Sequence, residues 1–455
     1  MINLRKTKIL AKIADNRSEL PFLKTLFEAG ADVAWLNTAH QDEPATLEVV
    51  NKIRSLSTEI PIMIDTKGPE IRTKNIEAPI SVAAGAKVIL TGDLSYVGEN
   101  VIHVSYANFH NEVPVGESIL YDDATLELIV EKKLENGIEC SLKSAGVIKN
   151  KKSLNIPNVH IKLPALSEKD KGFINFCAKH NIDYIAHSFV RSKEDLFEIK
   201  AILKNYPDYK GRIISKIENR EGFTNLKEIL ENSEGLMVAR GDLGAEVLLE
   251  EVPFMQKKMV EMTLAMGKYC IVATQALESM IKNPRPTRAE ITDVANAVLD
   301  GTGAMSMSGE TAYGDYPKEA TQVMGRIMKY TEEKRDDLVH FVTKPHLTTP
   351  AYKAAQDIIA KAESAKVHVV VVLAKDMEVV RALSAYHPTA LVVPVCVNEA
   401  DVRELRLAYA IRPIFAKALD AKIALDELKN SGVKGSVLVV TEKADFNYDF
   451  RTETV

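Results

Sequence analysis

The sequence predicts an α/β fold: a (β/α)8 TIM barrel with an inserted small all-β domain and a C-terminal open α/β domain. Eight short runs rich in Val, Ile and Ala recur along the 455-residue chain, and segments of helical period lie between most of them. The runs are apolar rather than alternating, as in parallel strands that are covered on both faces. One interval between two runs is much longer than the others, and further strands follow the eighth run, which indicates two additional domains.

The eight predicted barrel strands mostly end in polar or charged residues. They cover residues 7–14, 32–38, 60–66, 182–189, 212–219, 234–242, 269–275 and 303–311. Helices are expected between them, for example over Glu19–Glu28 and Lys193–Lys204. A capping box at Thr287–Glu290, in which the Thr hydroxyl and the Glu carboxylate bind free backbone N–H groups, predicts the start of a further helix. We assign residues 1–73 and 157–337 to the barrel.

The long interval and the chain after the barrel have strand patterns of their own. Residues 74–156 contain short strands bounded by Gly turns, which is typical of a small β-barrel, and we expect this domain to close over the active site. Residues 338–455 are predicted to form the C-terminal α/β domain. The strands expected in these two domains are Lys87–Leu90, Ser118–Leu120, Thr125–Val130, Val369–Leu373, Ala390–Val397 and Ser436–Thr441.

The composition argues against several classes of protein. Lys and Arg number 58 against 63 Asp and Glu, a net charge of −5, and no dense basic run is present, so we expect no binding to nucleic acid. No stretch of about 18 apolar residues occurs, so we expect no membrane span, and the first residues do not have the pattern of a signal peptide. The four cysteines are far apart in the sequence and fit buried thiols in the reducing cytoplasm.

Polar residues gather at the carboxyl ends of the predicted strands, where the active site of a TIM barrel lies. Lys216 and Glu218 are two residues apart on one strand, so their side chains point to the same face. Inside a parallel barrel they must pair, bind a ligand or take shifted pKa values, and a purely structural ion pair is the alternative. Asp242 follows a Gly at the end of the next strand, where an Asp also serves as a helix N-cap.

Together these residues have the chemistry of a phosphoryl-transfer site. Glu218 and Asp242, from adjacent strands, suit Mg²⁺, which binds a few carboxylates and keeps positions for water and substrate oxygens. Lys216 adds a positive charge, and Arg72 adds a planar fork that matches phosphate or carboxylate. Gly241 allows a backbone N–H to approach an anion closely. The chain lacks the GxxxxGK[ST] phosphate loop, so a nucleotide must be held in another way, for example between the barrel and the inserted domain.

Six segments of the barrel resemble the pyruvate kinase family. They are DTKGPEIRT (65–73), SKIEN (215–219), MVARGDLG (237–244), ATQALESM (273–280), NPRPTRAEITDVANAVLDGT (283–302) and SGETAYGDYP (308–317). The motifs are long and run through the whole barrel, while the other two domains follow the family layout more loosely. The resemblance implies a phosphotransferase of glycolysis, which transfers the phosphoryl group of phosphoenolpyruvate to ADP and yields pyruvate and ATP, with Mg²⁺ (or Mn²⁺) and K⁺ as cofactors.

The resemblance also implies roles for individual residues. The catalytic set comprises Lys216, Arg72, Thr274, Ser308 and Glu310. In this set Lys216 stabilises the transferring phosphoryl group, and the other hydroxyl and carboxyl groups form the relay that protonates the enolate. The substrate is expected on Lys216, Gly241, Asp242 and Thr274, and the nucleotide on Arg72, His40 and Lys152. Mg²⁺ is expected on Glu218 and Asp242, and K⁺ on Asn37, Asp65 and Thr66.

Several positions depart from the family pattern near the phosphates. Trp35, the chain's only Trp, stands where the family has an Arg that meets the phosphate, and an indole offers no charged contact. It is free to stack on the adenine, on Lys12 or on Arg72, or to pack at the barrel rim. Ala39 replaces a hydroxyl that would bind K⁺. Loss of one charged contact costs about 3 kcal/mol, or about 10²-fold in rate, so we expect a weakened enzyme rather than an inactive one.

Two rival functions stay open, and both keep the barrel. One is a Mg²⁺-dependent carbon–carbon lyase acting on the enolate of pyruvate or oxaloacetate, which would not need ADP. The other is a non-catalytic regulatory paralogue, which the changes at Trp35 and at residues 12–15 motivate. We also expect a homotetramer, as is usual in the family. Activation by fructose bisphosphate is not expected, because Ala374–Val379 replaces the Thr-x-Ser-Gly-x-Thr loop that would hold its phosphate.

Overall fold

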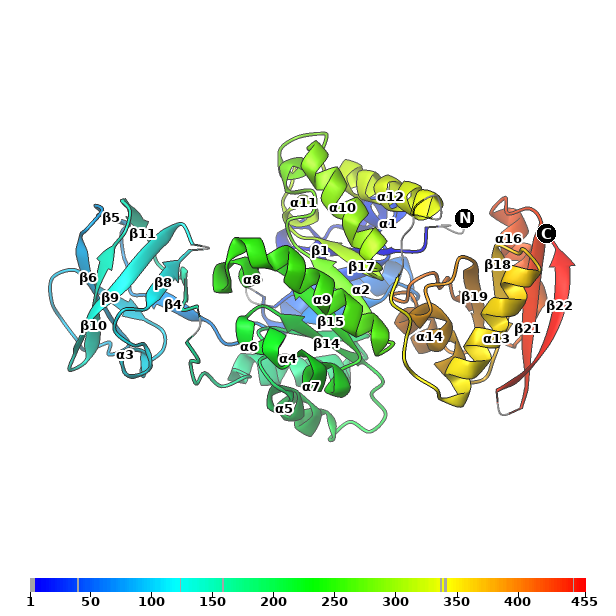
Figure 1. The fold of residues 1–455 in the computed structure, drawn as a ribbon, viewed down its shortest axis with the longest axis horizontal. Helices are drawn as coiled ribbons and strands as arrows, with labels where there is room; N and C mark the ends of the chain where they lie inside the picture. Colours follow the sequence, from blue (N-terminus) through cyan, green and yellow to red (C-terminus); the bar gives the residue numbers. More distant parts are fainter. Residues whose placement is uncertain are drawn as a thin grey trace.

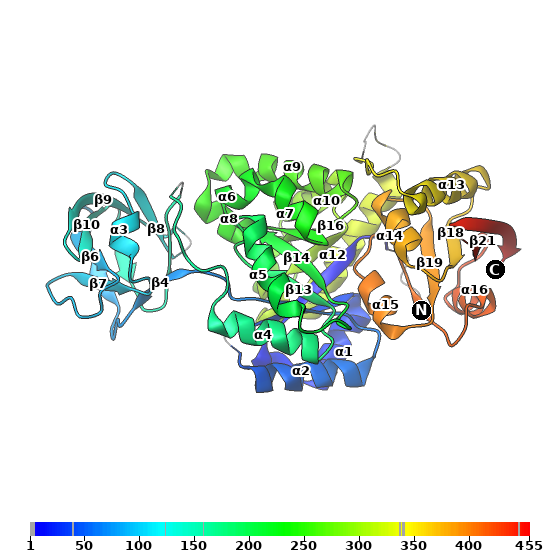
Figure 2. The same cartoon turned by 90° about the horizontal axis from the view of Figure 1, so that it is seen from below.

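The computed structural model describes residues 5–38, 41–122, 124–157, 159–335, 338, 342–444 and 446–455. Figures 1 and 2 show three parts in a row, with the barrel in the centre, the inserted β domain on one side and the C-terminal domain on the other. No helix among the described residues is long and apolar enough to cross a membrane. The four cysteines are buried and form no disulfide, as the sequence predicted.

The central part is a closed barrel of eight parallel strands, which confirms the predicted fold class. In the order of the chain they are β1 (Lys8–Ile13), β2 (Val33–Asn37), β3 (Ile62–Asp65), β13 (Tyr184–His187), β14 (Arg212–Ile217), β15 (Gly235–Ala239), β16 (Tyr269–Ala273) and β17 (Ala304–Met307). Each strand pairs in parallel with its neighbours, and β17 closes the barrel against β1. All eight lie within the predicted ranges.

Two of the predicted strands extend too far at their carboxyl ends. The range 234–242 includes the start of helix α8 (Arg240–Glu246), and the range 303–311 includes helix α11 (Gly309–Ala312). In both places the chain leaves the barrel directly into a helix, and the helix satisfies the backbone N–H and C=O groups that the strand ladder no longer pairs. Short helices of this kind hold polar side chains at the rim of the barrel.

Helices surround the barrel, and the longer ones each bury one apolar stripe. They are α1 (Leu20–Ala29), α2 (Glu43–Leu56), α4 (Glu168–Lys179), α5 (Lys193–Leu203), α6 (Arg220–Thr224), α7 (Leu226–Asn232), α8, α9 (Val252–Ala265), α10 (Arg288–Asp300), α11 and α12 (Pro317–Lys334). Helix α10 begins with the predicted capping box, because the Thr287 hydroxyl and the Glu290 carboxylate bind each other's backbone N–H. It ends at Gly301, whose φ of 97° is in the left-handed region.

Apolar side chains fill the inside of the barrel as well as the layer beneath the helices. The interior cluster includes Leu10, Trp35, Met63, Ile214 and Ile271, and it also includes Leu407 of the C-terminal domain. The amino ends of the strands therefore face the C-terminal domain. Their carboxyl ends face the inserted domain, so the predicted site lies between the barrel and that domain (Figure 1).

The inserted domain is a second, smaller closed barrel. Its strands are β4 (Ile71–Lys74), β6 (Lys87–Thr91), β7 (Val101–Val104), β8 (Ser118–Tyr121), β9 (Leu126–Leu134), β10 (Gly137–Leu142) and β12 (Ser153–Asn155), and β5 (Ile80–Val82), β11 (Gly146–Ile148) and the short helix α3 (Phe109–Glu112) complete it. Strand β4 pairs with β7 and β12, so the small barrel already begins before residue 74, where the prediction placed its start. Arg72 therefore stands on the inserted domain rather than on the central barrel.

The C-terminal domain has a five-stranded sheet in the order β20-β19-β18-β21-β22. The strands are β18 (Val369–Leu373), β19 (Leu391–Cys396), β20 (Ile414–Phe415), β21 (Ser436–Ala444) and β22 (Asn447–Thr454), and the helices are α13 (Pro350–Ser364), α14 (Glu378–Ala385), α15 (Glu399–Leu405) and α16 (Ala421–Asn430). The sequence did not predict β22, because this antiparallel edge strand is largely exposed and polar.

Candidate active site

Most of the predicted site residues line one cavity at the carboxyl ends of the barrel strands. Its volume is about 200 Å³. The predicted residues that line it are Asn37, Asp65, Thr66, Arg72, Lys216, Glu218, Asp242, Thr274 and Ser308. They come from six barrel strands or the turns that follow them and, in the case of Arg72, from strand β4 of the inserted domain. Lys12 and Trp35 also line this cavity.

Lys216 forms the centre of a buried cluster of charges. Its Nζ lies 3.1 Å from Glu218 Oε1 and 3.5 Å from Asp65 Oδ2, and it donates a hydrogen bond to Ser188 Oγ at 2.9 Å. Burial by itself would lower the pKa of Lys216, but the charges of Asp65, Glu218 and Asp242 outweigh burial and raise this pKa. The Lys216 ammonium therefore keeps its proton and its positive charge at the bottom of the cavity.

The two predicted Mg²⁺ ligands line this cavity together. Burial and the nearby charge of Asp242 raise the pKa of Glu218, while the Lys216 ammonium opposes this change, and Glu218 Oε2 accepts a hydrogen bond from the Phe189 N–H. A cation between the two carboxylates would relieve their repulsion. Among the described residues, no group of three or more His, Cys, Asp or Glu side chains is placed to hold a metal. Two carboxylates fit Mg²⁺, which commonly takes one or two and completes its shell with water and phosphate oxygens.

One of the predicted K⁺ ligands has an open oxygen. Asp65 Oδ1 is buried and accepts no hydrogen bond from the described part of the chain, so it fits a cation. The Thr66 hydroxyl is engaged, since it accepts a hydrogen bond from the Ser188 N–H and lies 3.2 Å from His187 Nδ1. Burial lowers the pKa of His187 to about 4, so this imidazole is neutral near pH 7. Asn37 ends strand β2 beside them, and Ala39 lies outside the described residues.

Thr274 and Gln275 hold an unusual backbone conformation next to the cavity. Their φ angles are 67° and 51°, in the left-handed region that non-glycine residues seldom adopt. The Arg240 guanidinium donates hydrogen bonds to both of their carbonyl oxygens and forms an ion pair with Asp293 at 2.7 Å. Such a conformation persists where surrounding contacts fix it, and it is common at functional sites. The sequence alone indicates no role for Arg240 or Asp293, because no local pattern reveals a left-handed Thr.

Gly241 and Thr274 bind each other directly. The Gly241 N–H donates a hydrogen bond to Thr274 Oγ1 at 2.9 Å, and Thr274 Oγ1 donates to the carbonyl oxygen of Ala273 at 2.6 Å. The Gly241 N–H, which the sequence assigned to the substrate, thus bonds to the Thr274 hydroxyl. Thr274 and Asp242 both line the cavity, and their roles toward the substrate stay a prediction.

Ser308 and Glu310 take different positions around the cavity. Ser308 Oγ is buried, lines the cavity and has no hydrogen-bond partner among the described residues. Glu310 is 1% exposed and does not line the cavity. Its two carboxylate oxygens accept hydrogen bonds from the N–H groups of Leu277 and Ser308, at 3.0 and 2.8 Å. Glu310 therefore holds the backbone of two loops and positions Ser308.

Of the two predicted nucleotide ligands that the structure describes, Arg72 lines the cavity and Lys152 does not. The Arg72 guanidinium bonds to both oxygens of Glu70, at 3.0 and 2.7 Å, and to the carbonyl oxygen of Lys151. Lys152 Nζ lies 2.9 Å from Asp122 and is not part of the cavity lining. His40 lies outside the described residues. The nucleotide site stays a prediction.

Comparison with known proteins decides the family. A family model described as the barrel domain of pyruvate kinase matches residues 4–321. This chain is 41% identical to a pyruvate kinase of Borreliella burgdorferi over 98% of its own length and 96% of the relative's length. The chain belongs to the pyruvate kinase family. A pyruvate kinase of Bacillus licheniformis is 39% identical, over 95% of this chain and 75% of the relative.

The three-dimensional fold agrees with the pyruvate kinase assignment. A crystal structure of a pyruvate kinase from Cryptosporidium parvum superposes with a TM-score of 0.90 and 30% sequence identity, and the match covers 99% of this chain and 96% of that chain. The likeness therefore includes the inserted and C-terminal domains as well as the barrel. The sequence resemblance, which was strongest in the barrel, is confirmed as a family relationship.

Trp35 departs from the pyruvate kinase pattern, and its surroundings are now clear. The ring is 2% exposed and belongs to the interior cluster of the barrel, while one side lines the cavity. Lys12, its partner in the register of β1 and β2, places Nζ 5.0 Å from the centre of the ring. Two of the alternatives weighed from the sequence, contact with Lys12 and packing within the barrel, therefore both describe Trp35. Burial lowers the pKa of Lys12, and the charge of Asp65 opposes this change.

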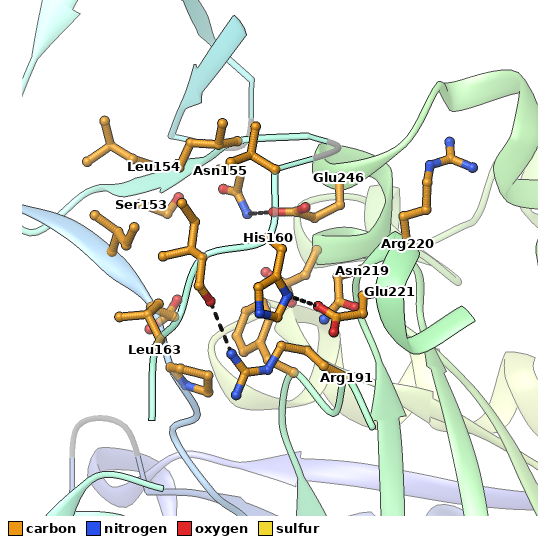
Figure 3. Close-up of a pocket in the computed structure, with 18 residues that line it drawn as sticks. Ser153, Leu154, Asn155, His160, Leu163, Arg191, Asn219, Arg220, Glu221 and Glu246 are labelled. Carbon is orange, nitrogen blue, oxygen red and sulfur yellow. Dashed lines mark hydrogen bonds and ion pairs between the residues drawn. The ribbon is translucent and has the colours of Figure 1, made fainter. Parts of the chain in front are cut away.

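A larger cavity, of about 540 Å³, lies between the barrel and the inserted domain, and it shares Glu70, Phe189 and Asp242 with the smaller one. Figure 3 shows Asn155, at the end of β12, reaching Glu246 of α8, and His160 reaching Glu221. These bonds measure 2.8 and 2.7 Å. They attach the returning segment of the inserted domain to the barrel, and sequence analysis did not single them out.

Proposed function

We propose that this chain transfers the phosphoryl group of phosphoenolpyruvate to ADP and forms pyruvate and ATP. One observation carries the proposal: Lys216, Glu218 and Asp242 line a single cavity in a chain that matches proteins named pyruvate kinase over nearly its whole length. Members of the family depend in general on a divalent metal and K⁺, and the oxygens of this cavity suit both cations.

This reaction requires stabilisation of negative charge on the transferring phosphoryl group and on the enolate oxygen. The bond between phosphorus and the enol oxygen breaks, the phosphoryl group passes to a terminal oxygen of ADP, and an enolate remains. Lys216, held by Glu218, Asp65 and Ser188, faces this developing charge without needing to reorganise. Mg²⁺ held by Glu218 and Asp242 would supply Lewis-acid stabilisation of the same oxygens when bound.

The enolate then takes a proton at its methylene carbon and becomes pyruvate. Ser308 is our first candidate for the last proton donor, because its hydroxyl is buried, lines the cavity and bonds to no described residue. Thr274, on the loop after the neighbouring strand β16, is proposed to support the substrate carboxylate together with the backbone N–H of Asp242. Glu310 contributes as a positioning residue through the Ser308 backbone.

The cation and nucleotide ligands belong to the same proposal. Asn37, Asp65 and Thr66 are proposed for K⁺, and the open oxygen of Asp65 supports this choice. The nucleotide is proposed to bind across the two domains, on Arg72, His40 and Lys152, with Arg72 released from Glu70 to meet a phosphate. The four buried thiols suit a cytoplasmic location.

A homotetramer is part of the proposal, and one exposed apolar surface supports it. Leu248 and Leu249, just before α9, and Phe254, in its first turn, are 63%, 73% and 76% exposed. A second copy that covers this surface would bury them. We expect sedimentation equilibrium to give a tetramer, and we expect the variant L249E/F254E to give smaller species while V97E, a control at an exposed position of the inserted domain, stays tetrameric. A monomeric wild type, or an unchanged variant, would contradict this assembly.

The direct test of the function is the formation of pyruvate from phosphoenolpyruvate, with ADP and Mg²⁺ present or omitted. We expect turnover that requires ADP and Mg²⁺ and that rises with K⁺. Pyruvate release that does not depend on ADP would reject the kinase. Binding of phosphoenolpyruvate without turnover would instead identify a regulatory protein.

A further inference from the structure

Lys12 is a charged residue of the cavity to which the proposed function has given no role. It stands on β1, one residue before the end of the strand, and its side chain lines the cavity that contains Lys216, Asp242 and Thr274. No hydrogen bond or ion pair joins Nζ to any described residue. Its one polar contact in this part of the chain is the Trp35 ring, 5.0 Å from Nζ to the ring centre.

An ammonium group that lies in a cavity without a hydrogen-bond partner lowers the stability of the fold, because burial removes water from its three N–H donors. A ring face compensates in part through the cation–π interaction, which leaves the N–H groups on the far side unused. In the same cavity Lys216 already has Glu218, Asp65 and Ser188 as partners. Lys12 therefore offers donors that the described protein does not satisfy, and these donors fit the oxygens of an anionic ligand.

The neighbouring strand offers no alternative cation. Strand β2, Val33–Asn37, carries apolar residues and one Asn, and Trp35 occupies the position in register with Lys12. The Trp35 ring instead serves as the surface on which Lys12 rests. Strand β1 thus supplies a positive charge next to β2, with the aromatic ring of β2 beside it, and Lys67, Arg72 and Lys216 are the other cations that line the cavity.

We propose that Lys12 binds a phosphate oxygen of phosphoenolpyruvate and that Trp35 holds its ammonium in position for this contact. This assignment rests on the proposed function, since it names the ligand of the same cavity. It makes Lys12 a substrate-binding residue of this chain and Trp35 a positioning residue. Lys12, held by Trp35, supplies the positive charge that no side chain of β2 carries.

The first experiment measures binding without turnover. Trp35 is the only Trp in the chain, so intrinsic fluorescence reports directly on the ring beneath Lys12. Phosphoenolpyruvate, and inorganic phosphate in a separate titration, are added to the full-length protein with Mg²⁺ and no ADP. We expect a saturable change in emission, and we expect Lys12→Met to raise the Kd for phosphoenolpyruvate at least about tenfold. The control Lys24→Met, at an exposed lysine of α1, should match the wild type.

The second experiment measures kcat/KM for phosphoenolpyruvate. Lys12→Met and Lys12→Thr should lower it by about 10²-fold, the usual effect of losing one charged donor to a transferring group. Lys12→Arg keeps the charge and should retain most of the activity. The double variant Lys12→Thr/Trp35→Arg moves the cation to β2 and should recover at least about tenfold over Lys12→Thr. A structural role alone would not give this recovery, because the double variant changes the packing twice.

The results of these experiments separate the role of Lys12 from the kinase activity of the chain. An active wild type whose Kd and kcat/KM are unchanged in Lys12→Met overturns the role of Lys12 and leaves the kinase standing. A wild type that binds phosphoenolpyruvate through Lys12 but forms no pyruvate overturns the kinase and leaves Lys12 as an anion ligand. If the variant Lys12→Met does not fold, unchanged kcat/KM in Lys12→Gln overturns the role of Lys12.

Discussion

At the scale of single residues, the polar groups at the cavity are of two kinds: some have hydrogen-bond or ion-pair partners, and others have none among the described residues. Lys216, Glu218 and Glu310 bond to side chains or backbone groups of known position, which holds them rigid. Asp65 Oδ1 and Ser308 Oγ are buried, and neither has a hydrogen-bond partner among the described residues. Both residues also line the cavity, so these two atoms mark the places where a cation and a reacting group are expected.

The Ser308 hydroxyl gives a prediction that isolates the proton-transfer step. We expect Ser308→Ala to slow the exchange of the methyl hydrogens of pyruvate with D2O by at least about tenfold, because the last donor to the enolate is lost. Proton NMR of pyruvate in the presence of enzyme and Mg²⁺ measures this exchange directly. The variant S306A is the matched control, since Ser306 is buried on β17 and does not line the cavity. Equal exchange rates in Ser308→Ala and wild type would remove Ser308 from the relay.

The site residues that the sequence reveals differ in their surroundings from those that only the structure reveals. Lys216, Glu218 and Asp242 could be proposed from the sequence, because a charge on a buried parallel strand or directly after one demands a partner or a ligand. Arg240 and Asp293 were not, since their role depends on the left-handed backbone of Thr274, which arises only when the loops pack together. The bond between Asn155 and Glu246 was missed for the same reason, because it joins two domains that are far apart in sequence.

At the scale of elements, the connection between β12 and α8 contains a titratable group. Burial raises the pKa of Glu246 from 4.5 to about 7, the charge of Asp242 adds to this, and the Asn155 hydrogen bond opposes it. The unfolded chain loses this proton near its ordinary pKa and the folded chain only near pH 7. The stability that the protonated carboxyl contributes is therefore present in acid and falls as the pH rises from about 4.5 to about 7.

The variant Glu246→Gln keeps an oxygen for the Asn155 amide and carries no charge at any pH. We expect it to match the wild type at pH 5 and to be more stable by about 1–2 kcal/mol at pH 8, after allowance for the partial exposure of this side chain. Urea unfolding at the two pH values measures the difference. A stability difference that is the same at pH 5 and pH 8 would show that Glu246 does not titrate in this range.

The loop between β18 and α14 gives a second prediction at this scale. The Lys375 N–H donates to Glu442 Oε2 and the Glu378 N–H donates to Asp376 Oδ1, each at 2.8 Å. Carboxylates thus occupy backbone N–H groups that would otherwise hold a phosphate, and they repel one. We expect fructose bisphosphate to leave the rate at subsaturating phosphoenolpyruvate unchanged. An activation of more than about twofold would contradict this account of the loop.

At the scale of the whole molecule, the two outer domains are attached to the barrel in different ways. Lys8 Nζ donates to the carbonyl oxygen of Ile411 at 2.5 Å, and Arg403 Nε lies 2.7 Å from Asp183, so the C-terminal domain is joined to the barrel through buried or nearly buried charges. The inserted domain is joined partly through the pair His160 and Glu221, which are 55% and 36% exposed. This difference fits a fixed base and an inserted domain that covers the cavity.

The sequence predicted this three-domain arrangement more fully than it predicted the contacts between the domains. The eight barrel strands were visible as apolar runs, because parallel strands are buried on both faces. The start of the inserted domain at β4 was not visible, since Ile71–Lys74 continues a catalytic motif without a break in composition. Strand β22 was missed because an exposed edge strand has no apolar face to reveal it.

The most direct test of the central claim is the rate of pyruvate formation from phosphoenolpyruvate, ADP and Mg²⁺ in the wild type and in Lys216→Met. Methionine has a similar length and no charge, so the change removes the ammonium that Glu218, Asp65 and Ser188 hold in place. We predict clear turnover in the wild type and a loss of at least about 10³-fold in kcat for the variant, with a normal circular dichroism spectrum. Equal kcat in the two proteins would contradict the assignment of this cavity as the phosphoryl-transfer site.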